Sequence, residues 1–399
     1  MLKRKVTTLR RLLSISLVLL LYCCSIFTFA GDFDRFNDEF ERLKHKTQIN
    51  HAPLGRKAKS HKSLNGTKFP FVIDVPKNYD KNKTYPVHVF LHGLINRSKP
   101  KTRSYIDPYL KRLMIPGTIS VFPKGWGDER WWQDSQIDNI STILDNLKNT
   151  YNIDTNRIYL HGVSDGGHGV YYIASHAPTD YAAFLPLIAS PFVANQHSGA
   201  STPLFLTNLI NKPLYIVNTS NDHLYPAEKY SEFANSLQKN NNQTEFYVIE
   251  NGQHNLKWLK DKESSRLSFL KKTVRDPYPD NIYWEVDHQL NFPRYHWLII
   301  KDVVELDEEK FVHIRKKGNS VLVNSKNIKE FKLLISPEDF NVAENIVIHI
   351  NGEEVINEKL DMKVSILQKW YKEDLDVNQL YGAELIFKKD ERWSYILKE

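Results

Sequence analysis

The chain has 399 residues, 54 Lys+Arg against 47 Asp+Glu for a formal net charge of +7, and 41% hydrophobic residues. This composition excludes intrinsic disorder for most of the chain and allows two or three domains of roughly 100–200 residues each. Two cysteines, Cys23 and Cys24, are too few for a disulfide framework, and no Cys/His cluster has the spacing of a zinc site.

The first thirty residues predict an export signal. Five basic residues and no acids precede an apolar run from Leu12 to Tyr22, and the small residues Thr28 and Ala30 follow it. This order is typical of a cleaved signal peptide and predicts a secreted or periplasmic protein. An uncleaved membrane anchor at residues 12–30 is the alternative. Cleavage after Ala30 would remove both cysteines and lower the net charge from +7 to +2.

Residues 31–66 are polar and charged, which predicts a loosely attached leader with one helix around Phe36–Leu43. From residue 67 to 275, apolar runs alternate with helical patterns. The expected strands are Phe71–Val75, Tyr85–Leu91, Ser120–Pro123, Arg157–Leu160, Ala183–Ile188, Pro213–Asn218 and Thr244–Glu250. The expected helices are 136–150, Asp165–Ser175, one starting near Pro226, and Glu263–Lys272. This alternation predicts the α/β class, a mostly parallel sheet with helices on both faces.

Beyond the sequence Asp276-Pro277-Tyr278-Pro279, strand patterns dominate. The expected strands are Trp297–Ile300, Lys310–Ile314, Ser320–Val323, Phe331–Ile335, Ile346–Ile350 and Glu384–Phe387. Asn351-Gly352 predicts a hairpin turn, since both residues tolerate positive φ. Residues 281–399 are therefore expected to form a small β-rich accessory domain.

The sequence Gly162-Val163-Ser164-Asp165-Gly166 lies between an expected strand and an expected helix. At a sharp strand-to-helix turn, glycines two positions to either side relieve crowding around an exposed nucleophile. Ser164 is therefore the candidate nucleophile. A plain glycine-rich turn is the alternative.

A serine hydroxyl needs an adjacent base, and after this kind of turn the expected chain order is Ser, acid, His. Asp222 follows the strand Pro213–Asn218, and His254 follows the strand Thr244–Glu250. Because the carboxyl ends of parallel strands meet at one edge of a sheet, both side chains can reach Ser164. The alternatives are a helix N-cap for Asp222 and a solvated loop histidine for His254.

Ester cleavage also needs two N–H donors for the oxyanion. We expect one from Asp165, the residue after the nucleophile, and one from Leu94 in His92-Gly93-Leu94, at the end of the strand Tyr85–Leu91. A simple turn at the strand end is the alternative for Leu94.

These motifs resemble the α/β-hydrolase superfamily over residues 68–273. The matching stretches are Phe90–Gly93, Tyr151–Tyr159, the Ser164 turn, Asp222–Pro226 and Gly252–His254. Within the superfamily the chain is similar to the esterase branch with polyhydroxybutyrate depolymerases and feruloyl or acetylxylan esterases. The resemblance implies a serine hydrolase that cleaves carboxylic esters through an acyl-enzyme, without a cofactor. The loop His92–Ile95 lacks the further glycines of many esterases.

The segment 124–132 contains Trp126, Trp131 and Trp132. With Tyr225 they are candidates to line a cleft for an aromatic or sugar-bearing substrate, with burial in the protein as the alternative for the tryptophans. About 24 residues separate Ile188 from Pro213, too few for a large cap domain. The expected partner is thus a small-molecule or polymer-attached ester, and no motif indicates a nucleic acid or a metal ion. A serine peptidase of the prolyl-oligopeptidase type and a non-catalytic binding protein are the alternative functions.

Overall fold

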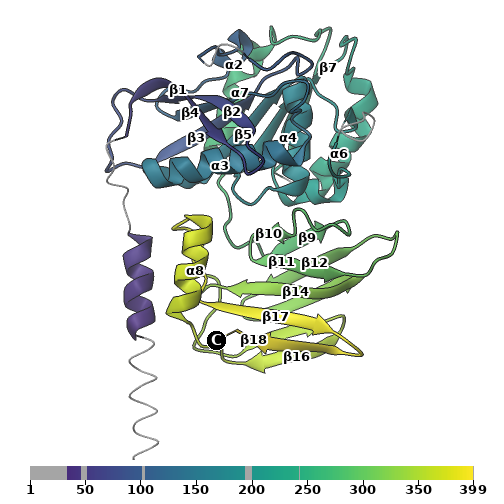
Figure 1. The fold of residues 1–399 in the computed structure, drawn as a ribbon. Coiled ribbons are helices and arrows are strands. Elements are labelled where there is room, and N and C mark those ends of the chain that lie inside the picture. Colours follow the sequence, from purple (N-terminus) through teal and green to yellow (C-terminus); the bar gives the residue numbers. More distant parts are fainter. Residues whose placement is uncertain (1–33, 46–51, 101–103, 194–199, 242, 399) are drawn as a thin grey trace, which may run out of the picture.

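The computed structural model describes residues 34–45, 52–100, 104–193, 200–241 and 243–398. The expected export signal lies outside these ranges and stays a prediction. None of the helices within them is long and apolar enough to cross a bilayer. Figure 1 shows two domains joined near residue 275, one with a sheet between helices and the other mainly of strands.

The first domain, here the α/β domain, contains an eight-stranded sheet in the order β1-β2-β4-β3-β5-β6-β7-β8. From β4 to β8 neighbouring strands are parallel, and β1 and β2 add antiparallel pairs at one edge. The strands are β1 (Gly55–Lys62), β2 (Lys68–Val75), β3 (Tyr85–Leu91), β4 (Ile119–Pro123), β5 (Ile153–Val163), β6 (Ala183–Leu187), β7 (Tyr215–Thr219) and β8 (Glu245–Ile249).

Helices cover both faces of this sheet, which confirms the predicted α/β class. They are α2 (Pro108–Lys111), α3 (Asp134–Thr150), α4 (Asp165–His176), α6 (Ser231–Asn240) and α7 (Leu259–Lys272), with 3₁₀ turns η1 (Leu206–Asn211) and η2 (Ala227–Tyr230). Buried side chains of α3, α4 and α6 share one apolar cluster with one face of the sheet. Those of α2 and α7 belong to the cluster on the other face.

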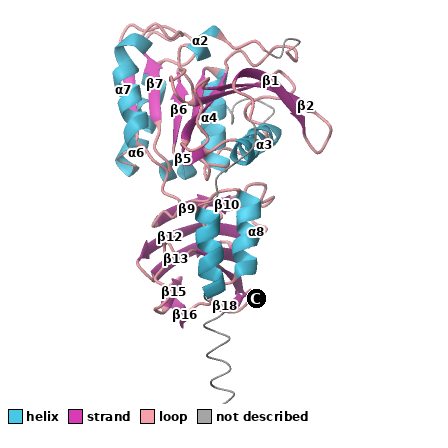
Figure 2. Cartoon of the chain, turned by 90° about the vertical axis from the view of Figure 1, so that its left-hand side faces the viewer, coloured by secondary structure: helices cyan, strands magenta, loops and turns pink. Residues whose placement is uncertain are grey.

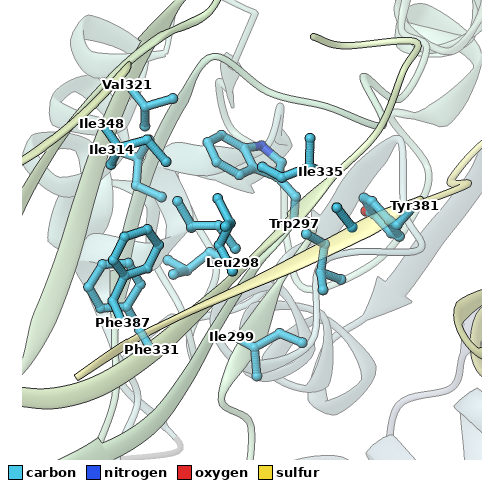
Figure 3. Packing of buried hydrophobic residues seen from close by; sticks show 14 of the residues in the cluster. Trp297, Leu298, Ile299, Ile314, Val321, Phe331, Ile335, Ile348, Tyr381 and Phe387 are labelled. Atoms are coloured by element: carbon cyan, nitrogen blue, oxygen red, sulfur yellow. The ribbon is translucent and has the colours of Figure 1, made fainter. Parts of the chain in front are cut away.

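The second domain, the β-rich domain, has two five-stranded sheets in the orders β10-β11-β14-β17-β18 and β16-β15-β13-β12-β9. Its elements are β9 (Asn281–Glu285), β10 (Arg294–Tyr295), β11 (Leu298–Val303), β12 (Phe311–Lys317), β13 (Ser320–Lys326), β14 (Ile328–Ile335), β15 (Ile346–Ile350), β16 (Glu353–Glu358), α8 (Val364–Asp374), β17 (Ala383–Lys389) and β18 (Trp393–Leu397). Apolar side chains from both sheets fill one core between them (Figure 3). The hairpin turn at Asn351-Gly352 has the expected positive φ, 52° and 91°.

The predicted loose leader at residues 31–66 is wrong in two respects. Gly55–Lys62 is strand β1, paired along its length with β2. A helix at residues 34–44, here the N-terminal helix, buries Phe36, Phe40 and Leu43 in the core of the β-rich domain. It stands beside α8 in Figures 1 and 2, and Gln368 of α8 donates a hydrogen bond to Glu39. Its apolar residues at helical spacing thus find a partner far along the chain.

The β-rich domain contacts the α/β domain at the amino end of the central strand β5. The guanidinium of Arg275 donates to Asp376 Oδ2 at 2.6 Å and to Asn156 Oδ1 at 2.9 Å, and both members of the Arg275–Asp376 pair are fully buried. Thr155 Oγ1 donates to the other oxygen of Asp376 at 2.7 Å. Ser164 directly follows the carboxyl end of β5. The β-rich domain therefore contacts the end of this strand that is opposite to Ser164.

Candidate active site

Ser164 occupies a strained turn between β5 and α4. Its φ of 55° and ψ of −121° lie outside the regions that ordinary residues favour. A Cβ added to Gly162 would overlap the carbonyl of Gly166, and one added to Gly166 would overlap the carbonyl of Leu91. Only glycine fits at these two positions, so the tight turn requires both glycines of the sequence pattern. The turn presents the hydroxyl at the carboxyl end of the sheet.

The structure brings Ser164, Asp222 and His254 together. His254 Nε2 lies 2.9 Å from Ser164 Oγ, and His254 Nδ1 lies 2.8 Å from Asp222 Oδ2. The Asp222 side chain is fully buried, and its Oδ1 accepts hydrogen bonds from the N–H groups of Leu224 and Tyr225 at 2.8 and 3.0 Å. The carboxylate therefore orients the histidine with one oxygen and holds its own loop with the other. The imidazole has the contacts that a base acting on the hydroxyl requires.

The loop after β3 lies directly against Ser164. A Cβ added to Gly93 would lie 3.2 Å from Ser164 Cβ. Leu94 has a φ of 55°, and Asp165 opens α4, where the first N–H groups have no partner within a helix. Among the described residues neither the Leu94 N–H nor the Asp165 N–H has a hydrogen-bond partner. Both are available to an oxygen atom bound beside Ser164.

Two side chains for which the sequence predicted no role, His92 and Arg97, hold this loop. Gly125 N–H donates to His92 Nε2 at 3.3 Å, so His92 Nδ1 carries the proton and donates to Gly93 O at 2.8 Å. Burial lowers the pKa of His92 to about 4, which keeps the ring neutral. Arg97 donates to Leu94 O at 2.5 Å and to Gly93 O at 3.0 Å. Because a trans peptide points its C=O and N–H in opposite directions, holding Gly93 O fixes the direction of the Leu94 N–H.

The prediction that Trp126, Trp131 and Trp132 line a substrate cleft is wrong. Each is at most 4% exposed, and none lines the cavity at Ser164. Trp131 packs below the loop after β3, and its Nε1 donates to His92 O at 2.8 Å. A Cβ added to Gly169 of α4 would overlap the Trp131 side chain, so the glycine makes room for the indole. Trp131 therefore supports the site from beneath.

A cavity of about 430 Å³ opens at Ser164 and His254. Tyr225 lines it as predicted, and its ring lies 5.7 Å from that of His254. Burial raises the pKa of Tyr225 to about 12, so the phenol keeps its proton at neutral pH. Four large side chains at the cavity are more than two-fifths exposed: Leu94, Tyr105, Tyr109 and Leu224. The cavity is thus open and largely apolar at its mouth. In the described part of the chain no three His, Cys, Asp or Glu side chains are grouped to hold a metal ion.

Parts of this chain are similar to known proteins. A bifunctional acetylxylan esterase/xylanase, XynS20E of Neocallimastix patriciarum, is 28% identical over 138 residues, 33% of this chain and 20% of that protein. The chain thus spans about a fifth of that relative's length. A thermostable esterase of solved structure is similar over 55% of this chain and 63% of its own, at 21% identity and a TM-score of 0.44. Dipeptidyl peptidase 4 of Porphyromonas gingivalis is similar over 56% and 36%, at 15% identity and a TM-score of 0.42.

One family model covers nearly the whole α/β domain. The family described as "Putative esterase" matches residues 62–260, which include the Ser164 turn, Asp222 and His254. Residues 62–260, the greater part of the α/β domain, therefore match this esterase family.

Proposed function

We propose that this protein is an exported serine esterase in which Ser164, His254 and Asp222 form the catalytic triad. The observation that carries the proposal is the bridging position of His254, whose two ring nitrogens lie 2.9 Å from Ser164 Oγ and 2.8 Å from Asp222 Oδ2. The Leu94 and Asp165 N–H groups are the oxyanion donors. Export is proposed on the sequence of residues 1–30 alone.

In the acylation step Ser164 Oγ attacks the ester carbonyl carbon while its proton passes to His254 Nε2. Asp222 stabilises the imidazolium that forms. The carbonyl oxygen becomes an oxyanion and accepts hydrogen bonds from the Leu94 and Asp165 N–H groups. The imidazolium then gives its proton to the leaving alkoxide, which departs as an alcohol. Ser164 is left as an acyl ester.

In the second step a water molecule attacks the acyl carbon and gives one proton to His254. The same two N–H groups stabilise the second oxyanion. When that intermediate collapses, Ser164 Oγ leaves and recovers its proton from His254. The products are the free acid and the enzyme in its starting state. Each step uses the histidine first as base and then as acid.

We propose that the substrate ester is bulky or attached to a polymer. The cavity is lined in part by four exposed side chains, which offer apolar surface at its mouth: Leu94, Tyr105, Tyr109 and Leu224. Tyrosine rings bind aromatic groups and the faces of sugars through such surface. The curated relative is an acetylxylan esterase by name, which adds acylated polysaccharide to the candidate substrates.

A serine-directed fluorophosphonate probe tests the nucleophile. Wild type is expected to be labelled and Ser164→Ala to be unlabelled, while Ser63→Ala, in the turn after β1, serves as the matched control and stays labelled. Turnover should fall on the order of 10⁴-fold or more in Ser164→Ala and in His254→Ala, and no further in the double variant. Labelling that persists in Ser164→Ala would contradict the triad.

A substrate panel tests the reaction class. Short acyl esters, feruloyl sugars and peptide amides are assayed in parallel with wild type and Ser164→Ala. Hydrolysis of esters with no measurable cleavage of amides is the expected result. Amide cleavage at a comparable rate would favour a peptidase, and binding without cleavage would favour a non-catalytic protein.

A further inference from the structure

A second cavity of about 300 Å³ adjoins the active site. We call it the side cavity, and its lining includes His92, Arg97, Ser98, Tyr105, Asp107 and Lys124. It shares Tyr105 and Asp107 with the cavity at Ser164, so the two spaces lie on either side of one short segment. Neither the triad nor the oxyanion donors line it. Its contents would therefore not interfere with the proposed proton transfers.

A buried cation lines the side cavity. Lys124, directly after β4, is 4% exposed, and burial lowers its pKa to about 8, so the amine is still mainly protonated at neutral pH. Its Nζ donates to the backbone carbonyl of Tyr105. No described carboxylate forms an ion pair with it, although the negative charge of Asp107 partly offsets the effect of burial on its pKa. An ammonium group has three donors, and a buried charge without a close counterion is costly. Lys124 is thus suited to receive an anion.

A second cation faces the same space. Arg97 uses two of its five N–H donors on Gly93 O and Leu94 O, and among the described residues the other three have no acceptor and can bind a ligand. Asp107 supplies a negative charge to the lining, and its Oδ1 accepts a hydrogen bond from the Tyr109 N–H. Among the described residues that line the side cavity, Arg97, Lys124 and Asp107 carry a summed charge of one positive unit. This matches a singly charged group such as a carboxylate better than a doubly charged phosphate.

We propose that the side cavity binds a carboxylate that belongs to the ester substrate, held by Lys124 and Arg97. The proposal rests on the proposed esterase function and narrows it to esters that carry an acidic group away from the bond that is cleaved. Because Arg97 also holds the carbonyls of Gly93 and Leu94, a carboxylate bound to it would steady the loop that carries the oxyanion donor. Substrate binding and oxyanion stabilisation would then be coupled through one side chain.

Calorimetry on Ser164→Ala tests binding without turnover. The probes are the monoethyl esters of succinate, glutarate and adipate, each compared with its uncharged diethyl ester. For the best of the three lengths, the monoester is expected to bind at least tenfold more tightly than the diester. Adding Lys124→Met should abolish this difference, and adding Lys124→Arg should retain much of it. Adding Lys99→Met, which removes a positive charge from the same loop outside the cavity, should leave it unchanged.

Equal affinities for monoester and diester would overturn the proposal, as would a preference that survives Lys124→Met in a protein with unchanged thermal unfolding. Because Ser164→Ala does not turn over, this result stands even if the proposed hydrolysis fails. In wild type, kcat/KM should favour 4-nitrophenyl monoesters of the same diacids over their methyl 4-nitrophenyl diesters by at least tenfold, and Lys124→Met should remove that ratio. If the monoester binds tightly but kcat/KM shows no preference for monoesters, the side cavity binds a free carboxylate. That result would overturn the proposal that the carboxylate belongs to the substrate.

Discussion

The Asp165 carboxylate accepts a hydrogen bond of 2.8 Å from the N–H of Ile95. This bond joins the start of α4 to the loop after β3, 70 residues earlier in the chain. The backbone N–H of Asp165 and that of Leu94, the neighbour of Ile95, are the two proposed oxyanion donors. One side chain thus sets the distance between the two halves of the oxyanion site.

Asp165→Ala should lower kcat on the order of 10–100-fold, with a smaller change in KM. The backbone donors remain, but the loop after β3 loses its link to α4, and loss of a whole oxyanion donor costs about 10²–10³-fold. Asp165→Asn keeps an oxygen acceptor for Ile95 and should retain most of the activity. Steady-state kinetics on one short ester compares the three proteins. A kcat of Asp165→Ala equal to that of wild type would show that the link is dispensable.

Asp376→Asn should destabilise the protein by about 3–5 kcal/mol, because it leaves the buried Arg275 without its counterion. Asp74→Asn is the matched control, since it breaks the half-exposed Arg56–Asp74 pair and should cost at most about 1 kcal/mol. Denaturant unfolding measures both variants. Equal costs would mean that the buried pair between the domains contributes no more than a surface pair.

Gly382→Ala should weaken docking of the N-terminal helix. A Cβ there would lie 2.7 Å from Phe36 Cζ and 2.6 Å from Met362 Sδ, and overpacking of this kind costs about 1–3 kcal/mol. Phe36→Ala should cost about 3–5 kcal/mol by leaving a cavity. The double variant should cost less than the sum of the two single costs, since removing the ring makes room for the methyl group.

The matched control is Gly127→Ala, whose Cβ would have its nearest neighbour at 3.6 Å. Its stability should stay within about 1 kcal/mol of wild type. If the cost of the double variant equals the sum of the two single costs, Phe36 does not pack against Gly382.

Acid should destabilise the protein through the buried His88. Burial lowers the pKa of His88 to about 3, and its Nδ1 lies 2.9 Å from His161 Nε2. Below pH 6.5 the His88 side chain binds a proton in the unfolded chain but not in the folded protein. The free energy of unfolding therefore decreases by about 1.4 kcal/mol for each unit by which the pH is lowered. Above pH 6.5 the effect vanishes. His88→Asn should thus gain about 2–3 kcal/mol relative to wild type between pH 6.5 and 4.5. His45→Gln, at an exposed site, is the control. Parallel pH profiles of His88→Asn and wild type would contradict this account.

The sequence predicts the α/β domain well because most of its strands are buried on both faces and therefore appear as apolar runs. The three residues Ser164, Asp222 and His254 could be placed together because each follows an apolar run, although β8, the strand before His254, is only partly buried. Strand β1 escapes prediction, since Gly55–Lys62 lies at the sheet edge and is mostly polar. Arg97 escapes it for another reason. Its contacts with two backbone carbonyls depend on the path of a loop, and no residue pattern encodes them.

The tryptophans show a different limit. An aromatic segment near a strand end fits both a substrate cleft and a buried support, and composition does not distinguish them. The structure decides through Gly169, whose missing side chain leaves the space that Trp131 fills. That pairing joins two segments of the chain, so it becomes visible only when the packing is known.

The burial of the N-terminal helix makes the β-rich domain discontinuous in sequence. Phe36, Phe40 and Leu43 complete a core whose other members lie beyond residue 277, and Glu39 and Gln368 are separated by 329 positions. The α/β domain is thus an insertion between two parts of its neighbour. Domains generally fold as units while the chain is made, and contacts between distant segments form slowly. The α/β domain can therefore be folded before the N-terminal helix has contacted its partner residues, and docking of that helix would be the last step of assembly.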